Sequence, residues 1–118
     1  MVDWLVRARQ EGYAIPAFNV CELQSVRAIV EVCEEERAPC LLQVAETHVA
    51  GMEPEYFVAV VRAAAELARV PVALHYDHGR SFEGIMRAIR AGFTSVMIDG
   101  SDLPYAENVA LTREIVRV

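Results

Sequence analysis

Lysine is absent from this sequence of 118 residues, and all 11 basic residues are arginines. Without a lysine, no catalytic Schiff base between a substrate carbonyl and a lysine amine can form within these residues. The 17 acidic residues outnumber the arginines, so the net charge is −6, and no basic cluster is present. A nucleic-acid-binding surface depends on such a cluster, so we expect no nucleic-acid partner.

The sequence also lacks an uninterrupted apolar run of about 18 residues, the length that a membrane-spanning helix needs, so we expect no membrane span. The first residues, Met1 to Trp4, lack the basic and apolar segments of an export signal, and we therefore expect a cytoplasmic protein. Cys21, Cys33 and Cys40 form no C-x-x-C pair. We expect reduced, mostly buried thiols with no redox or structural zinc role.

Apolar residues are abundant, at 54% of the sequence, and charged residues make up 24%. This composition and length predict one globular domain. Short apolar runs alternate with longer amphipathic segments, a pattern typical of a parallel sheet covered by helices. Each run is nearly continuous, as expected of a strand buried on both faces. The four predicted strands are Tyr13 to Val20, Pro39 to Ala45, Pro71 to Asp77 and Thr94 to Asp99.

A helix is predicted after each strand. The first helix carries apolar residues at steps of three and four, and the third has an N-cap serine and a C-terminal glycine. The predicted helices are Glu22 to Arg37, a segment that opens at Glu53-Pro54 and ends before Pro71, Ser81 to Gly92, and a segment from Ser101-Asp102 to the last residue. Short loops join all four units into one continuous layer.

Two architectures are compatible with four β-α units: half of an eight-stranded β/α barrel, or a small doubly wound sheet. A dinucleotide-binding sheet has a G-x-G-x-x-G motif after its first strand, whereas residues 18–22 contain no glycine. In a barrel, polar residues gather at the carboxyl ends of the strands. The sequence has this pattern, with Asn19, Glu46, Asp77, His78, Asp99 and Ser101 at those positions. It therefore favours the half-barrel.

The densest group of reactive side chains is His75-Tyr76-Asp77-His78-Gly79, at the end of the third predicted strand. On a strand, His75 and Asp77 project to the same side, and we expect His78 to follow where the chain leaves the sheet. An imidazole is a zinc ligand, and a neighbouring carboxylate can transfer a proton. Alternatively, His75 is a packed strand residue, and Asp77 with His78 caps the turn into the next helix.

Three segments together resemble the class II, zinc-dependent fructose-bisphosphate and tagatose-bisphosphate aldolases. They are EGYAIPAFN at 11–19, PVALHYDHG at 71–79 and RAGFTSVMIDGS at 90–101, and the similarity extends over essentially the whole sequence. The resemblance implies an α/β fold: the N-terminal half, about four β-α units, of a TIM (β/α)8 barrel. Residues 1–118 would then form a single partial barrel domain that ends within the fourth helix.

The resemblance also implies a reaction, the reversible cleavage of a ketose 1,6-bisphosphate to glycerone phosphate and glyceraldehyde 3-phosphate. Asp77 would be the general acid/base and His78 a zinc ligand. Zinc would bind the ketose oxygens and stabilise the enediolate of glycerone phosphate. The absence of lysine excludes the class I mechanism for this segment. Full-length members of the family form homodimers or tetramers, so a homo-oligomer is expected.

Further residues match family positions. Asn19 would contact substrate or serve as a turn residue, and Asp99, with Ser101 two residues later, would support the metal site or cap the next helix. His75 would have a structural role or support the metal site without binding the ion. His48, in the loop after the second predicted strand, is expected to be an ordinary loop residue, and Glu46 a solvated loop carboxylate.

The sequence departs from the family in two ways. Ala45 stands where many relatives have a serine, so the substrate pocket would lose one hydroxyl. The other zinc ligands, the phosphate-binding loops and strands five to eight are expected beyond residue 118, because a complete barrel takes about 250 residues. Four strands would leave two open edges. The chain is thus half of an aldolase, a catalytically inactive half-barrel that folds only with itself or a complementary chain, or a small metal-binding module.

Overall fold

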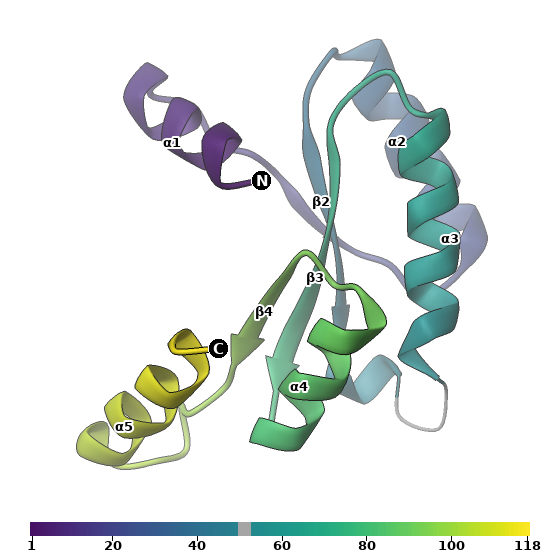
Figure 1. Cartoon of the computed structure of the whole chain (residues 1–118). Helices are drawn as coiled ribbons and strands as arrows, with labels where there is room; N and C mark the ends of the chain where they lie inside the picture. The colour runs from purple at the N-terminus through teal and green to yellow at the C-terminus, as the bar shows by residue number, and fades with distance from the viewer. Residues whose placement is uncertain (50–52) are drawn as a thin grey trace.

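A parallel sheet with a helix after each strand organises the computed structural model, which describes residues 1–49 and 53–118 (Figure 1). The strand order is β1-β2-β3-β4, so neighbours in sequence are neighbours in space. The strands are β1 (Ala17–Asn19), β2 (Cys40–Ala45), β3 (Val72–Gly79) and β4 (Ser95–Ile98). This sequential parallel order is that of a β/α barrel and confirms the predicted half-barrel.

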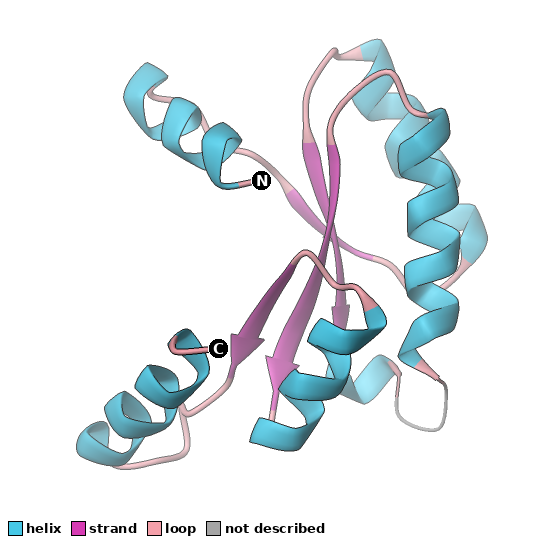
Figure 2. Ribbon diagram, viewed as in Figure 1, coloured by secondary structure: helices cyan, strands magenta, loops and turns pink. Residues whose placement is uncertain are grey.

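Helices follow each strand, as Figure 2 shows. They are α2 (Leu23–Glu35), α3 (Pro54–Leu67), α4 (Phe82–Ala91) and α5 (Tyr105–Val116), with a 3₁₀ turn, η1 (Glu46–His48), after β2. The helix α1 (Val2–Glu11) precedes the sheet and was not predicted. It ends at Gly12, whose positive φ of 76° is readily adopted by glycine.

One face of the sheet is covered by α2, α3 and α4, which lie on the same side of the strands in Figure 1. Alternate strand residues such as Leu42, Val44 and Tyr76 point to these helices and form the buried core with helix residues such as Val26 and Ile85. The opposite face has no such cover within the described residues. The expectation that every strand is buried on both faces is therefore wrong for β1, whose three residues are all exposed.

The strand boundaries differ most from the prediction at β1 and β3, while β2 differs by one residue at one end and β4 by one residue at each end. β1 is shorter than Tyr13 to Val20, because regular pairing begins only after Pro16, whose ring nitrogen carries no hydrogen to donate. β3 is longer and includes His78, which has a φ of 53° beside a bulge between Tyr76 and Gly79. The expectation that His78 lies beyond the sheet is therefore wrong, because the bulge keeps the residue within the strand.

The predicted helix ends hold at α4 and shift at α5. The Ser81 hydroxyl accepts a hydrogen bond from the Gly84 amide at 3.0 Å, and Gly92 ends the helix with a φ of 108°. α5 begins at Tyr105 after Pro104, later than the predicted start at Ser101-Asp102, and ends before the last residue. Proline favours a helix start, and this shift of a few residues moves Ser101 into the loop that carries Asp99.

The environment of the cysteines follows the prediction in part. Cys33 and Cys40 are buried between α2 and β2, while Cys21 is exposed. Leu23 and Leu67 are exposed, and each lies at an end of its helix, beside an open groove between α2 and α3. Among the described residues, no helix is long and apolar enough to cross a membrane.

Candidate active site

A row of four polar side chains crosses the uncovered face of the sheet. The strand register pairs Asn19 with Gln43, Gln43 with His75, and His75 with Ser95, so these side chains project to one face at one level. The Gln43 amide donates to Asn19 Oδ1 at 3.3 Å, and His75 Nδ1 contacts Ser95 Oγ at 2.5 Å. The row links β1 to β2 and β3 to β4 through side chains.

Asp77 lies one step closer to the carboxyl end of the strands, on the same face as this row. Its side chain is buried, and its two oxygens face two imidazoles: His75 Nε2 is 3.8 Å from Oδ1, and His78 Nε2 is 3.7 Å from Oδ2. The Gln43 amide donates to Asp77 Oδ2 at 3.2 Å, so one amide nitrogen serves both Asn19 and Asp77. Asp77 therefore lies on the uncovered face of the sheet and does not cap α4, whose N-cap is Ser81.

His78 is oriented by a carboxylate that follows directly after the next strand, β4. Its Nδ1 lies 2.9 Å from Asp99 Oδ2, while Asp99 Oδ1 accepts hydrogen bonds from the backbone amide and the hydroxyl of Ser101, at 3.0 and 2.6 Å. The imidazole is half-exposed, whereas the Asp99 side chain is buried. Asp99 thus supports His78 and does not cap α5, which begins after Pro104.

These contacts shift the pKa values of the two histidines in opposite directions. The hydrogen bond that His78 donates to Asp99, together with the charge of Asp77, raises the pKa of His78. Hydrogen bonds from Ser101 and then from His78 hold the pKa of Asp99 well below its usual range. Burial lowers the pKa of His75 more than the charge of Asp77 raises it. The half-exposed imidazole therefore favours its protonated form, and the buried one its neutral form.

Glu46 holds the loop that follows His78. Its Oε2 accepts a hydrogen bond from the Arg80 backbone amide at 2.6 Å, and its Oε1 lies where a side chain at Gly84 would come within 2.9 Å. Burial and the neighbouring Glu46 carboxylate raise the pKa of Tyr76 to about 12. The expectation of a solvated loop carboxylate is wrong for Glu46, because η1 directs it toward the start of α4.

Arg80 completes the charged rim of this site. Its guanidinium lies 2.9 Å from Asp102 and 3.7 Å from Asp99, and all three residues follow the carboxyl ends of β3 and β4. His48 lies outside the group, on η1, where it contacts Cys21.

Sequence reasoning missed Gln43, Ser95 and Arg80 as site residues. The signal for Gln43 is its position as the only polar residue within the apolar strand β2.

A catalytic zinc ion takes three protein ligands. Within residues 1–49 and 53–118, no group of three His, Cys, Asp or Glu side chains is placed to hold a metal ion. A histidine that binds a metal through one ring nitrogen usually donates a hydrogen bond from the other to a carboxylate. His78 has this contact, between its Nδ1 and Asp99. The described residues offer one oriented imidazole and do not by themselves fit a zinc site.

Comparison with known proteins shows the family. All residues from 1 to 118 match the family model for class-II fructose-bisphosphate aldolase. The chain belongs to this family. It is 44% identical over 123 residues to the probable fructose-bisphosphate aldolase of Bacillus subtilis, and the match covers 100% of the chain and 42% of that protein. It is 42% identical to the fructose-bisphosphate aldolase of Treponema pallidum, with 96% and 36% covered.

Solved structures of aldolases have the same fold as the chain. The YdjI aldolase of Escherichia coli K12 matches 97% of the chain and 44% of its own length, with a TM-score of 0.90 and 34% identity. The fructose-bisphosphate aldolase of Campylobacter jejuni matches 93% of the chain and 39% of its own length, with a TM-score of 0.81 and 26% identity. The chain therefore spans less than half the length of these aldolases.

Proposed function

We propose that this chain provides the acid/base Asp77 and the metal ligand His78 of a class II aldolase. The reaction is the reversible cleavage of a ketose 1,6-bisphosphate, of the fructose or tagatose configuration, to glycerone phosphate and glyceraldehyde 3-phosphate. The observation that carries this proposal is the placement of Asp77, which is buried between His75 and His78 on the face of the sheet that no helix covers. Family membership supplies the reaction class.

Asp77 acts as the proton carrier of the cleavage. Its carboxylate accepts the proton of the C4 hydroxyl as the bond between C3 and C4 breaks, the bonding electrons remain on C3, and C4 becomes an aldehyde. In the condensation direction, Asp77 returns the proton to the aldehyde oxygen. The Gln43 amide, which donates to Oδ2 at 3.2 Å, fixes the carboxylate for this transfer.

The other site residues orient these groups. Asp99, itself held by Ser101, keeps Nδ1 of His78 occupied and leaves Nε2 for a metal. His78 would hold a zinc ion together with ligands from elsewhere, and the ion would supply a positive charge that polarises a bound carbonyl. The remaining ligands belong to residues outside these 118, and Asn19 is positioned by Gln43 to contact substrate. We further propose a cytoplasmic homo-oligomer whose barrel domain begins with these 118 residues.

The test is a completed barrel, in which this chain is joined to the C-terminal part of the Bacillus subtilis relative that the match leaves uncovered. With zinc and either bisphosphate, we expect cleavage. Asp77→Asn should lower kcat by about 100-fold or more with little change in KM, because it removes the proton acceptor and keeps the shape. Asp3→Asn, at an exposed aspartate of α1 outside the site, is the matched control and should leave kcat unchanged. Unchanged turnover in Asp77→Asn contradicts the proposed role.

A second candidate function is a catalytically inactive half-barrel that assembles with another copy of itself. The observation that favours it is the exposure of all three β1 residues at an open edge of the sheet. A completed barrel without cleavage activity, together with a zinc-free dimer of the chain alone, would support this candidate over the aldolase.

A further inference from the structure

Cys21 and His48 form a pair outside the candidate active site. Cys21 lies just beyond β1, His48 lies on η1 just beyond β2, and Cys21 Sγ is 3.7 Å from His48 Nδ1. Both residues are exposed, in contrast to the buried thiols Cys33 and Cys40. Neither side chain contacts Asp77 or His78 in the described structure, so the aldolase proposal makes no use of this pair.

A nucleophile beside a base is the arrangement that activates a thiol. The thiolate is the reactive form of cysteine, and an adjacent imidazole can accept the thiol proton. The carboxyl ends of two neighbouring strands bring Cys21 and His48 together although 27 residues separate them. Exposure of Cys21 gives a reagent access to the sulfur.

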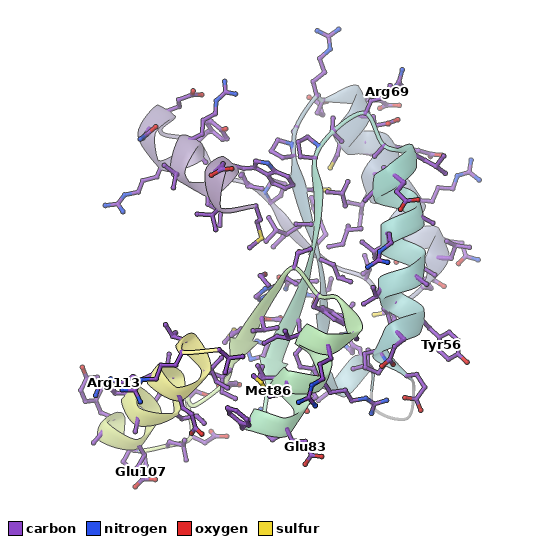
Figure 3. All side chains as sticks on the ribbon, viewed as in Figure 1. Tyr56, Arg69, Glu83, Met86, Glu107 and Arg113 are labelled. Carbon is purple, nitrogen blue, oxygen red and sulfur yellow. The ribbon has the colours of Figure 1, made fainter. Side chains whose placement is uncertain are left out.

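An apolar hollow adjoins the thiol. A cavity of about 180 Å³ lies between the N-terminal ends of α2 and α3. Besides Cys21 and one acidic residue, Glu22, it is lined by the apolar or aromatic side chains of Leu23, Val26, Tyr56, Phe57 and Val60. Tyr56 projects from the first turn of α3, as Figure 3 shows, and is exposed, whereas Phe57 is buried. These apolar and aromatic walls favour a ligand with an apolar or aromatic group beside its reactive sulfur.

We propose that Cys21 is a thiol-modification site for small disulfides that carry an apolar or aromatic group. The thiol proton moves to His48 Nδ1, and the Cys21 thiolate attacks one sulfur of the disulfide. The disulfide bond of the reagent breaks as a new one forms with Cys21, and the other half leaves as a thiol after it regains the proton. The apolar group of the bound half occupies the cavity beside Tyr56.

The first test measures the reaction of each thiol in the native chain with 2,2′-dithiodipyridine, by mass spectrometry of peptides at timed intervals. Cys21 should react at least about tenfold faster than Cys33 and Cys40, and His48→Asn should slow Cys21 by about tenfold, because an unassisted thiol is only a few per cent ionised at neutral pH. Equal rates at all three thiols, or an unchanged rate in His48→Asn, would overturn the proposal.

The second test concerns the cavity. The rate of reaction at Cys21 is measured with 2,2′-dithiodipyridine and with bis(2-hydroxyethyl) disulfide. The rate for each reagent is divided by the rate at which the same reagent reacts with free cysteine, and the two normalised rates are compared as a ratio. We expect a preference for the aromatic reagent, which Tyr56→Ser diminishes and Tyr105→Ser leaves unchanged, because Tyr105 is an exposed tyrosine on α5 outside the cavity. A normalised ratio of one in the native chain shows that the cavity takes no part and overturns that half of the proposal.

Discussion

Two histidines three positions apart in sequence have different environments. His75 is largely buried in the polar row beside Ser95, while His78 is half-exposed and held by Asp99. Burial removes water from one imidazole, and a carboxylate stabilises the charge of the other. The first is suited to hold Asp77 in place, and the second to bind a ligand through its free nitrogen.

The two imidazoles should titrate in opposite directions from the ordinary histidine pKa. In a metal-free sample, NMR titration should give a pKa above the ordinary value for His78 and below it for His75, as the directions of the shifts require. Asp99→Asn should lower the pKa of His78, since it removes the strongest stabilising contact, and should leave His75 nearly unchanged. Two indistinguishable pKa values in the native protein would contradict the described contacts.

The same pair makes stability depend on pH. Because folding raises the pKa of His78, the Asp99–His78 contact stabilises the fold fully below the unfolded histidine pKa and loses this effect as pH rises through the folded value. The destabilisation caused by Asp99→Asn in urea unfolding should therefore be larger at pH 6 than at pH 9. A difference that grows toward alkaline pH would have the wrong sign.

At this scale, sequence identified the polar ends of the strands and missed their connections. Asn19, Asp77, His78 and Asp99 were expected at one end of the sheet, and the structure places them there. Gln43 was missed because one polar residue in a strand does not reveal which neighbour it meets. Its contacts with Asn19 and Asp77 depend on the register between strands, which hydrophobic periodicity does not encode.

At the level of elements, local signals determined where α4 begins and ends. Ser81 caps α4 through the Gly84 amide, and Gly92 ends the helix with a positive φ. These are local backbone effects that sequence alone predicts well. The sequence pattern does not predict α1, because its apolar residues form no continuous stripe and it precedes the first of the repeated strand–helix units. Of its residues, only Ala8 is buried.

Removal of the Ser81 N-cap should destabilise α4, the helix that follows the site residues at the end of β3. Ser81→Ala should lower the free energy of unfolding by about 1 kcal/mol, because the Gly84 amide loses its acceptor. Ser81→Thr keeps a hydroxyl acceptor and serves as the matched control. Urea unfolding of the two variants measures the difference, and an equal loss in both would show that the cap contributes little.

At the scale of the molecule, the sheet is open on one face and along two edges. β1 and β4 lie at the ends of the strand order. Within the described residues, no helix covers the face that carries the row of polar side chains. Parallel sheets are normally covered on both faces. The chain matches less than half of each aldolase, and its open sheet corresponds to one half of a barrel.

The most direct measurement mixes the chain with a separately produced C-terminal part of the Bacillus subtilis relative and combines sedimentation velocity with an assay for fructose 1,6-bisphosphate cleavage. The account predicts a complex that contains both parts in equal number, and cleavage that depends on zinc and is lost in Asp77→Asn. A chain that pairs only with itself, or a mixed complex that forms but never cleaves the substrate, would contradict it.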